Sequence, residues 1–172
     1  MKNLLIFSLF LFACRSDNLL FLRPDSGAFE ATHFLVSALD SAVGCDILSL
    51  EPNSKQTQLR REVKIYRDDE YIITLGKDVG AVYDGNVIYK DLSYLETTIL
   101  NVPNRKNSSY SNYNIGDLMK LVVMHEIGHA LGLEHTEKIV SIMDPRVILM
   151  LPDDAIKSLV ELLNKNNLNH CR

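Results

Sequence analysis

The stretch His125–His135 reads H-E-I-G-H-A-L-G-L-E-H, and the rest of the chain is interpreted outward from it. His125 and His129 are four residues apart, so on a helix both imidazoles lean the same way and can share one metal ion. On a continued helix His135 would lie about 9 Å further along and point to the far side. Gly132 can adopt the left-handed backbone angles that end a helix. The spacing therefore predicts a helix, a break, and a return of the chain to the same metal.

The residue types in this stretch indicate a hydrolytic metal site. Three neutral imidazoles with an open fourth position are typical of catalytic zinc. Such a zinc ion lowers the pKa of water from about 15.7 towards about 7. Glu126 follows the first histidine, where it can take a proton from the attacking water and pass it to the leaving nitrogen. We expect one Zn²⁺ on His125, His129 and His135, with Glu126 as the catalytic general base.

The flanking sequence supports this site. Residues 117–131 carry apolar side chains at helical spacing, with Asp117 as the expected N-cap. Downstream, the segment Ser141–Pro145 reads S-I-M-D-P and places Met143 eight residues after His135.

The extended histidine motif and the methionine turn together resemble the metzincin clan of zinc endopeptidases, and most closely its matrixin branch. The resemblance implies the same three ligands and the same base. It also implies that Met143 forms a structural, hydrophobic floor under the metal, and that Pro145 lines the pocket for the side chain after the scissile bond. Two positions depart from the family: Asp144 replaces a common tyrosine, and Thr136 replaces a frequent serine.

The pattern along the chain predicts the order of elements. A helix over 26–43 starts at Ser26 and ends at Gly44. Strands are expected over 46–50, 63–67, 71–75 and 97–102, with a hairpin over 81–89, a surface loop over 103–114 and a last helix from 152. This order resembles the metzincin catalytic domain. It implies an α+β fold: a twisted, mixed, mostly parallel β-sheet with an N-terminal, an active-site and a C-terminal helix.

The resemblance also implies a strand that binds substrate. In metzincins an antiparallel edge strand pairs with the extended peptide. The candidate here is the run Asn86, Val87, Ile88 and Tyr89, and the alternative is an ordinary edge strand.

The N-terminus predicts export. Residues 1–13 are one lysine followed by a short apolar run, which is typical of a signal peptide. The run 11–14 (LFAC) resembles a bacterial lipobox, which would make Cys14 the lipidated N-terminus of a cell-envelope protein. Ordinary cleavage after Ala13, giving a secreted protein, is the alternative. We expect residues 14–25 to be a tether and residues 26–172 to form the peptidase domain.

The remaining cysteines leave two possibilities open. If Cys14 is acylated, Cys45 and Cys171 form a disulfide or stay as two thiols.

Composition narrows the function classes. The 172 residues suffice for one domain. The net charge of −4 and the lack of a basic stripe argue against nucleic-acid binding. Ca²⁺ binding stays open, although no EF-hand loop is visible. We therefore expect a monomeric zinc endopeptidase acting on a peptide or protein and attached to a membrane through lipid. The alternative is a weakly catalytic, zinc-binding adhesion lipoprotein, against which the intact Glu126 argues.

Overall fold

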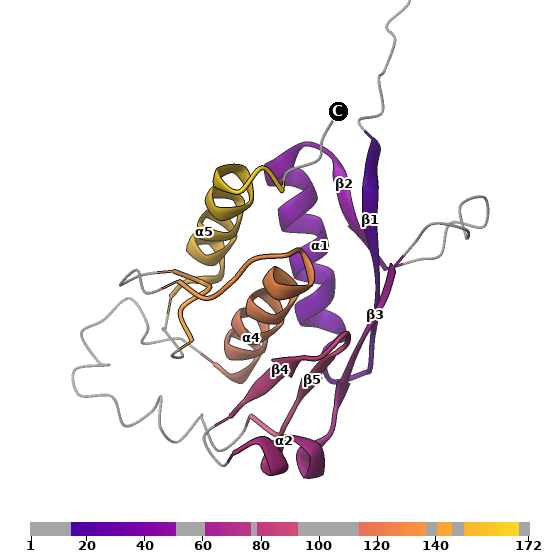
Figure 1. The fold of residues 1–172 in the computed structure, drawn as a ribbon, viewed down its shortest axis with the longest axis vertical. Coiled ribbons are helices and arrows are strands. Elements are labelled where there is room, and N and C mark those ends of the chain that lie inside the picture. The colour runs from indigo at the N-terminus through magenta and orange to yellow at the C-terminus, as the bar shows by residue number, and fades with distance from the viewer. Residues whose placement is uncertain are drawn as a thin grey trace, which may run out of the picture.

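The computed structural model describes residues 15–50, 61–76, 79–92, 114–136, 141–145 and 150–168. Within these ranges, helices α1 and α4 pack on each other and on one face of a five-stranded sheet, and α5 packs on both helices (Figure 1). The strands are β1 Arg15–Pro24, β2 Asp46–Ser49, β3 Arg61–Arg67, β4 Ala81–Tyr83 and β5 Val87–Tyr89. The helices are α1 Phe29–Val43, α2 Asp69–Leu75, α4 Ile115–Ala130 and α5 Pro152–Lys165.

The sheet is mixed and mostly parallel, as expected. Its strand order is β2-β1-β3-β5-β4, in which β1 runs parallel to β2 and β3, β3 runs parallel to β5, and β4 alone is antiparallel. The register pairs Leu22 with Val63, and Ile65 with Val87, and these four side chains are fully buried. The predicted α+β fold class is confirmed.

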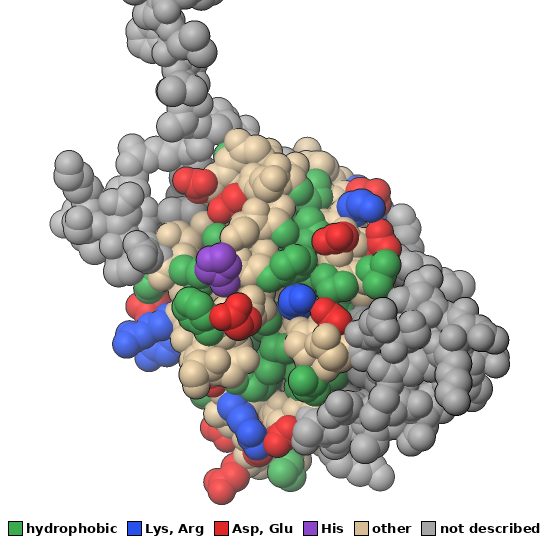
Figure 2. Space-filling view, turned by 180° about the vertical axis from the view of Figure 1, so that it is seen from behind, with side chains coloured by type: hydrophobic (Ala, Val, Ile, Leu, Met, Phe, Trp, Pro, Cys, Tyr) green, Lys and Arg blue, Asp and Glu red, His purple; other side chains and the backbone are tan. Residues whose placement is uncertain are grey.

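The described residues share one hydrophobic core between the sheet and the three long helices. Each helix contributes fully buried side chains, among them Leu35 of α1, Met124 and Ile127 of α4, and Leu159 and Leu163 of α5. On the rear face of the molecule, the acidic and basic side chains of the described residues are interspersed, and neither sign forms a continuous patch among them (Figure 2). No helix in the described ranges is both long and apolar enough to cross a membrane.

Strand β1 corrects the prediction of a tether over residues 14–25. Arg15–Pro24 lies between β2 and β3 in the sheet. Leu20 and Leu22 are buried, while Phe21 is half-buried and Arg23 is exposed. Both neighbours of this strand follow it in the sequence, so the hydrogen bonds that stabilise it cannot be read from its own residues.

Helix α1 confirms the predicted helix, but its first residues differ from the expectation. The N-cap is Ala28 rather than Ser26 and has no side-chain capping bond, while the Asp25 carboxylate accepts from the backbone N–H of Ala28 at 2.9 Å in the turn before the helix. The same carboxylate accepts from the hydroxyl of Tyr89 at 2.8 Å, which ties the helix to β5. Gly44 ends the helix with φ +80°, as predicted.

The predicted strand over residues 71–75 is wrong. These residues belong to α2, and the Asp68 side chain caps the helix by accepting from the N–H of Tyr71 at 2.9 Å. Two acidic residues in its first turn favour the helix dipole. Only Ile72 of this helix is buried, so the apolar, β-branched composition of the segment does not reflect strand pairing.

The predicted hairpin is confirmed, but the predicted substrate-binding edge is wrong. β4 and β5 flank a turn in which Gly85 has φ +70°. β5 lies between β3 and β4, so Val87, Ile88 and Tyr89 have partners on both sides and are buried. The Asn86 side chain accepts from a backbone N–H of β3 at 3.0 Å. Among the described strands, β4 is the one at this edge of the sheet.

Several predictions concern segments outside the described residues: the signal peptide over 1–13, Cys14, the strand over 97–102, most of the loop over 103–114, and Cys171. Cys45 is disulfide-bonded, which excludes the free thiol for this residue.

Candidate metal centre

Helix α4 carries the first two histidines. It begins at Ile115, two residues before the expected start, because Asn114 and Asp117 form a capping box in which each side chain accepts from the other residue's backbone N–H. Asp117 is thus the third helical residue rather than the cap. His125 and His129 lie one turn apart in the last part of this helix, and their ring centroids are 4.9 Å from each other.

The helix then breaks where the sequence predicts. Gly132 has φ +96°, in the left-handed region. Its N–H donates to the carbonyl of His129 at 3.0 Å, and the N–H of Leu133 donates to the carbonyl of Gly128 at 2.9 Å. This pair of bonds is a Schellman motif. It turns the chain back so that His135 faces the helix.

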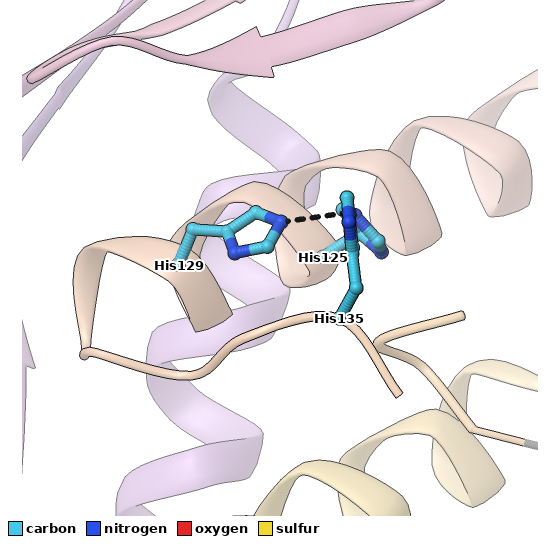
Figure 3. Close-up of side chains that lie close together, drawn as sticks. All are labelled: His125, His129 and His135. Atoms are coloured by element: carbon cyan, nitrogen blue, oxygen red, sulfur yellow. Dashed lines mark hydrogen bonds between the residues drawn. The ribbon is translucent and has the colours of Figure 1, made fainter. Parts of the chain in front are cut away.

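The three imidazoles converge on one point (Figure 3). The Nε2 atom of His135 lies 3.2 Å from Nε2 of His125 and 3.1 Å from Nε2 of His129. Nitrogen ligands at about 2.0–2.1 Å from a tetrahedral zinc ion are about 3.3 Å apart. The observed separations therefore fit a zinc ion held by three histidines.

Backbone carbonyls orient two of the rings. Nδ1 of His125 lies 2.7 Å from the carbonyl oxygen of Ile142, and Nδ1 of His129 lies 2.8 Å from that of Leu133. A carbonyl can only accept, so each Nδ1 carries the proton and, in the neutral ring, each Nε2 offers a lone pair to the shared point. This is the arrangement expected around a metal-binding histidine.

Burial affects the ionisable groups of the centre. It lowers the pKa of His125 to about 4 and also lowers the pKa of His135, which keeps both rings in the neutral form that binds metal. Burial raises the pKa of Glu126 to about 7. The Glu126 side chain is 6% exposed and directly follows a histidine of the cluster. A carboxylate with such a pKa is suited to accept and return a proton near neutral pH.

The methionine turn lies against the histidine helix. Met143 is fully buried, and its Sδ atom occupies the space where a side chain on Gly128 would begin. The carbonyl of Met143 accepts from the N–H of Thr136 at 2.9 Å, which joins the turn to the residue after His135. Met143 therefore lies against the helical segment between the two histidines.

The segment expected to line the substrate pocket is described only in part. Pro145 is exposed at the end of the turn, while Asp144 is buried. Residues 146–149, which follow the proposed pocket wall, lie outside the described residues.

Sequence reasoning missed the residues that join α4 to the sheet edge. β4 contacts α4, and nothing in the hairpin sequence shows which of its two strands lies outside. Arg61 at the start of β3 donates to the carbonyl of Ala130 at 3.4 Å, and its guanidinium carbon lies 5.4 Å from the ring centroid of Tyr83. No motif marks Arg61 in the sequence.

Comparison with known proteins agrees with the geometry. The matrixin family model matches residues 54–161, which is more than half of the chain and includes the whole histidine motif. Among curated proteins, no match to the chain is found. With three histidines placed to hold one metal ion and this family match, the chain belongs to the matrixin family of zinc metallopeptidases.

Proposed function

We propose that the chain is an exported zinc endopeptidase in which Glu126 is the general base. The observation that carries the proposal is the convergence of three Nε2 atoms, with separations of 3.1 and 3.2 Å to that of His135, beside a buried carboxyl group. A zinc ion bound there supplies a Lewis acid that polarises a peptide carbonyl and makes water nucleophilic near neutral pH. Glu126 accepts a proton from the attacking water and returns it to the nitrogen of the leaving peptide.

The backbone of β4 supports a way to hold an extended substrate. The N–H of Asp84 donates to the carbonyl of Asn86, and the N–H of Lys90 donates to the carbonyl of Gly80. Hydrogen-bonded and non-hydrogen-bonded pairs alternate in an antiparallel ladder. Tyr83, paired with Val87, and Ala81, paired with Tyr89, therefore direct their backbone N–H and C=O groups away from β5.

We infer that a peptide substrate adds to β4 as a further strand, through the outward backbone groups of Ala81 and Tyr83. Ala81→Pro removes an outward N–H that β5 does not use. It should raise KM for peptides severalfold and leave thermal stability nearly unchanged. An unchanged KM in a folded variant would contradict this binding mode.

The base is tested with a matched pair of glutamates. Glu134 lies in the same motif but is exposed, so Glu134→Gln is the control for Glu126→Gln. Each zinc-loaded protein is incubated with a peptide library, and cleavage is followed by mass spectrometry. We expect cleavage by the wild type and the control, and none by Glu126→Gln although it binds one zinc ion. Cleavage by Glu126→Gln at the wild-type rate would contradict the assigned base. Lack of cleavage by all three zinc-bound proteins would favour the adhesion lipoprotein.

The disulfide at Cys45 supports export, because such bonds persist in oxidising compartments. The other two cysteines, Cys14 and Cys171, lie outside the described residues. A Cys45–Cys171 bond is compatible with lipid on Cys14, whereas a Cys14–Cys45 bond excludes it. We expect the first. A non-reduced peptide map of the protein distinguishes the two. The first predicts linked Cys45 and Cys171 peptides with an acylated N-terminus, and the second predicts linked Cys14 and Cys45 peptides without acylation.

A further inference from the structure

Ile142, which orients His125, is itself held by two serine hydroxyls. Its carbonyl accepts from Nδ1 of His125 at 2.7 Å. Its own N–H donates to Oγ of Ser158, on α5, at 3.2 Å. The next N–H, that of Met143, belongs to the same peptide group as the Ile142 carbonyl and donates to Oγ of Ser141 at 3.2 Å. Every backbone polar group from the N–H of Ile142 to the N–H of Met143 thus has a partner.

The two histidines of α4 differ in how their carbonyl partners are held. Leu133, the partner of His129, is fixed by the backbone turn that ends α4. Ile142, the partner of His125, is 17 residues further along the chain. Its peptide groups are held toward α4 by the two side-chain oxygens. The orientation of the first histidine therefore depends on α5, an element outside the metal centre.

The packing of α5 on α4 holds the backbone of Ser158 in place. The neighbouring Leu159 is fully buried, and its Cδ1 atom lies 3.6 Å from where a Cβ on Gly128 would stand. The helix is thus packed directly against the segment of α4 between the two histidines. Ser158 is half-buried, and the Ile142 residue that it contacts is 5% exposed, so water cannot freely replace the hydroxyl.

We propose that Ser158 is a positioning residue of the metal centre, acting through Ile142 on His125, with Ser141 as its partner within the methionine turn. Without the Ser158 oxygen, the buried N–H of Ile142 has no acceptor, and the peptide group moves to find one. The carbonyl then loses its place at Nδ1, and the His125 ring is no longer confined to the tautomer and orientation that bind metal. The inference rests on the proposed function only in taking the three histidines as metal ligands.

The test compares Ser158→Ala with Ser158→Thr, which retains a hydroxyl, and with Ser37→Ala on the exposed face of α1. Zinc affinity is measured by competition with a chelator. The His125 tautomer is read from its ring ¹⁵N shifts by NMR without metal. We expect Ser158→Ala to bind zinc about tenfold more weakly and to mix tautomers, since loss of partners around metal ligands costs about 10–100-fold in affinity. The other two variants should match the wild type.

Two results would overturn the proposal: a folded Ser158→Ala protein with wild-type zinc affinity and tautomer, or Ser37→Ala with the same losses. Should Ser158→Ala unfold, Ser141→Ala provides the same test from within the turn, with the same expected changes. Neither readout requires a substrate. A failure of peptide cleavage would therefore contradict the proposed function, whereas the role of Ser158 is decided by the zinc affinity and the tautomer alone.

Discussion

Replacing Gly128 with alanine places a methyl group between the two helical histidines and the methionine turn. The new Cβ would overlap Sδ of Met143, lie 3.2 Å from its Cε, and make an ordinary 3.6 Å contact with Leu159. Met143 is fully buried and packed beneath α4, so its side chain has little room to move away. The substitution thus has two effects on stability: alanine favours the helix more than glycine does, and its methyl group overpacks the core.

The two effects have opposite signs and comparable size. Glycine to alanine inside a helix gains about 1 kcal/mol, while overpacking a core costs about 1–3 kcal/mol. We expect Gly128→Ala to lower the free energy of unfolding by about 1 kcal/mol. In a Met143→Ala background the overlap is gone, so the same change should raise the free energy of unfolding by about 1 kcal/mol.

This change of sign is measured with a double-mutant cycle by urea denaturation in the presence of chelator, so that metal binding does not contribute to stability. The expected interaction between the two sites is about 2 kcal/mol. If Gly128→Ala stabilises the protein equally in both backgrounds, Met143 does not fill the space beside Gly128 and the described packing under the metal centre is wrong.

Three further predictions follow from single residues. Burial raises the pKa of Asp40 from 3.8 to about 6, so the native state binds more protons than the unfolded chain between these values. The free energy of unfolding of the wild type, relative to that of Asp40→Asn, should therefore fall by about 1 kcal/mol as pH rises from 4 to 6, and then level off. Urea titrations of both proteins at each pH measure this difference, and a difference that does not change with pH would contradict the prediction. The Tyr83 hydroxyl is buried and has no hydrogen-bond partner among the described residues, so Tyr83→Phe should leave the melting temperature unchanged or higher, and a clear decrease would show that the hydroxyl has a partner. Gly132→Ala puts a side chain at φ +96°, which should cost about 1 kcal/mol and weaken zinc binding, as measured by denaturation and chelator competition; wild-type values for both would show that the left-handed turn is dispensable.

The metal centre could be predicted because its geometry is local. The three histidines are separated by one helical turn and one break, and the glycine that permits the break lies between the second and third ligands. Gly132 and Gly44 both adopt the left-handed conformation expected of them. The Asp84-Gly85 hairpin is local for the same reason.

The strand order could not be predicted because it depends on pairing between distant segments. Residues 15–24 resemble a tether beside a signal peptide, yet they pair with two strands that follow α1. The hairpin sequence likewise does not show whether β4 or β5 faces outward. Parallel pairing with β3 places β5 inside, and this moves the proposed substrate-binding edge from residues 86–89 to β4.

The groups around the ligands were equally beyond local reasoning. The contact between Ile142 and His125 spans 17 residues, and that between Ile142 and Ser158 spans 16. Each of these residues has an unremarkable sequence context. Only the packing of α5 on α4 brings them together.

The central claim, that three histidines hold one zinc ion which hydrolysis requires, is tested most directly by restoring zinc to protein stripped with a chelator. The rate of peptide cleavage is measured as zinc is added back in known amounts. The account predicts no cleavage by the stripped protein and a rate that rises with added zinc to a plateau at one ion per chain. Cleavage by the stripped protein, or full zinc binding without any cleavage, would contradict it.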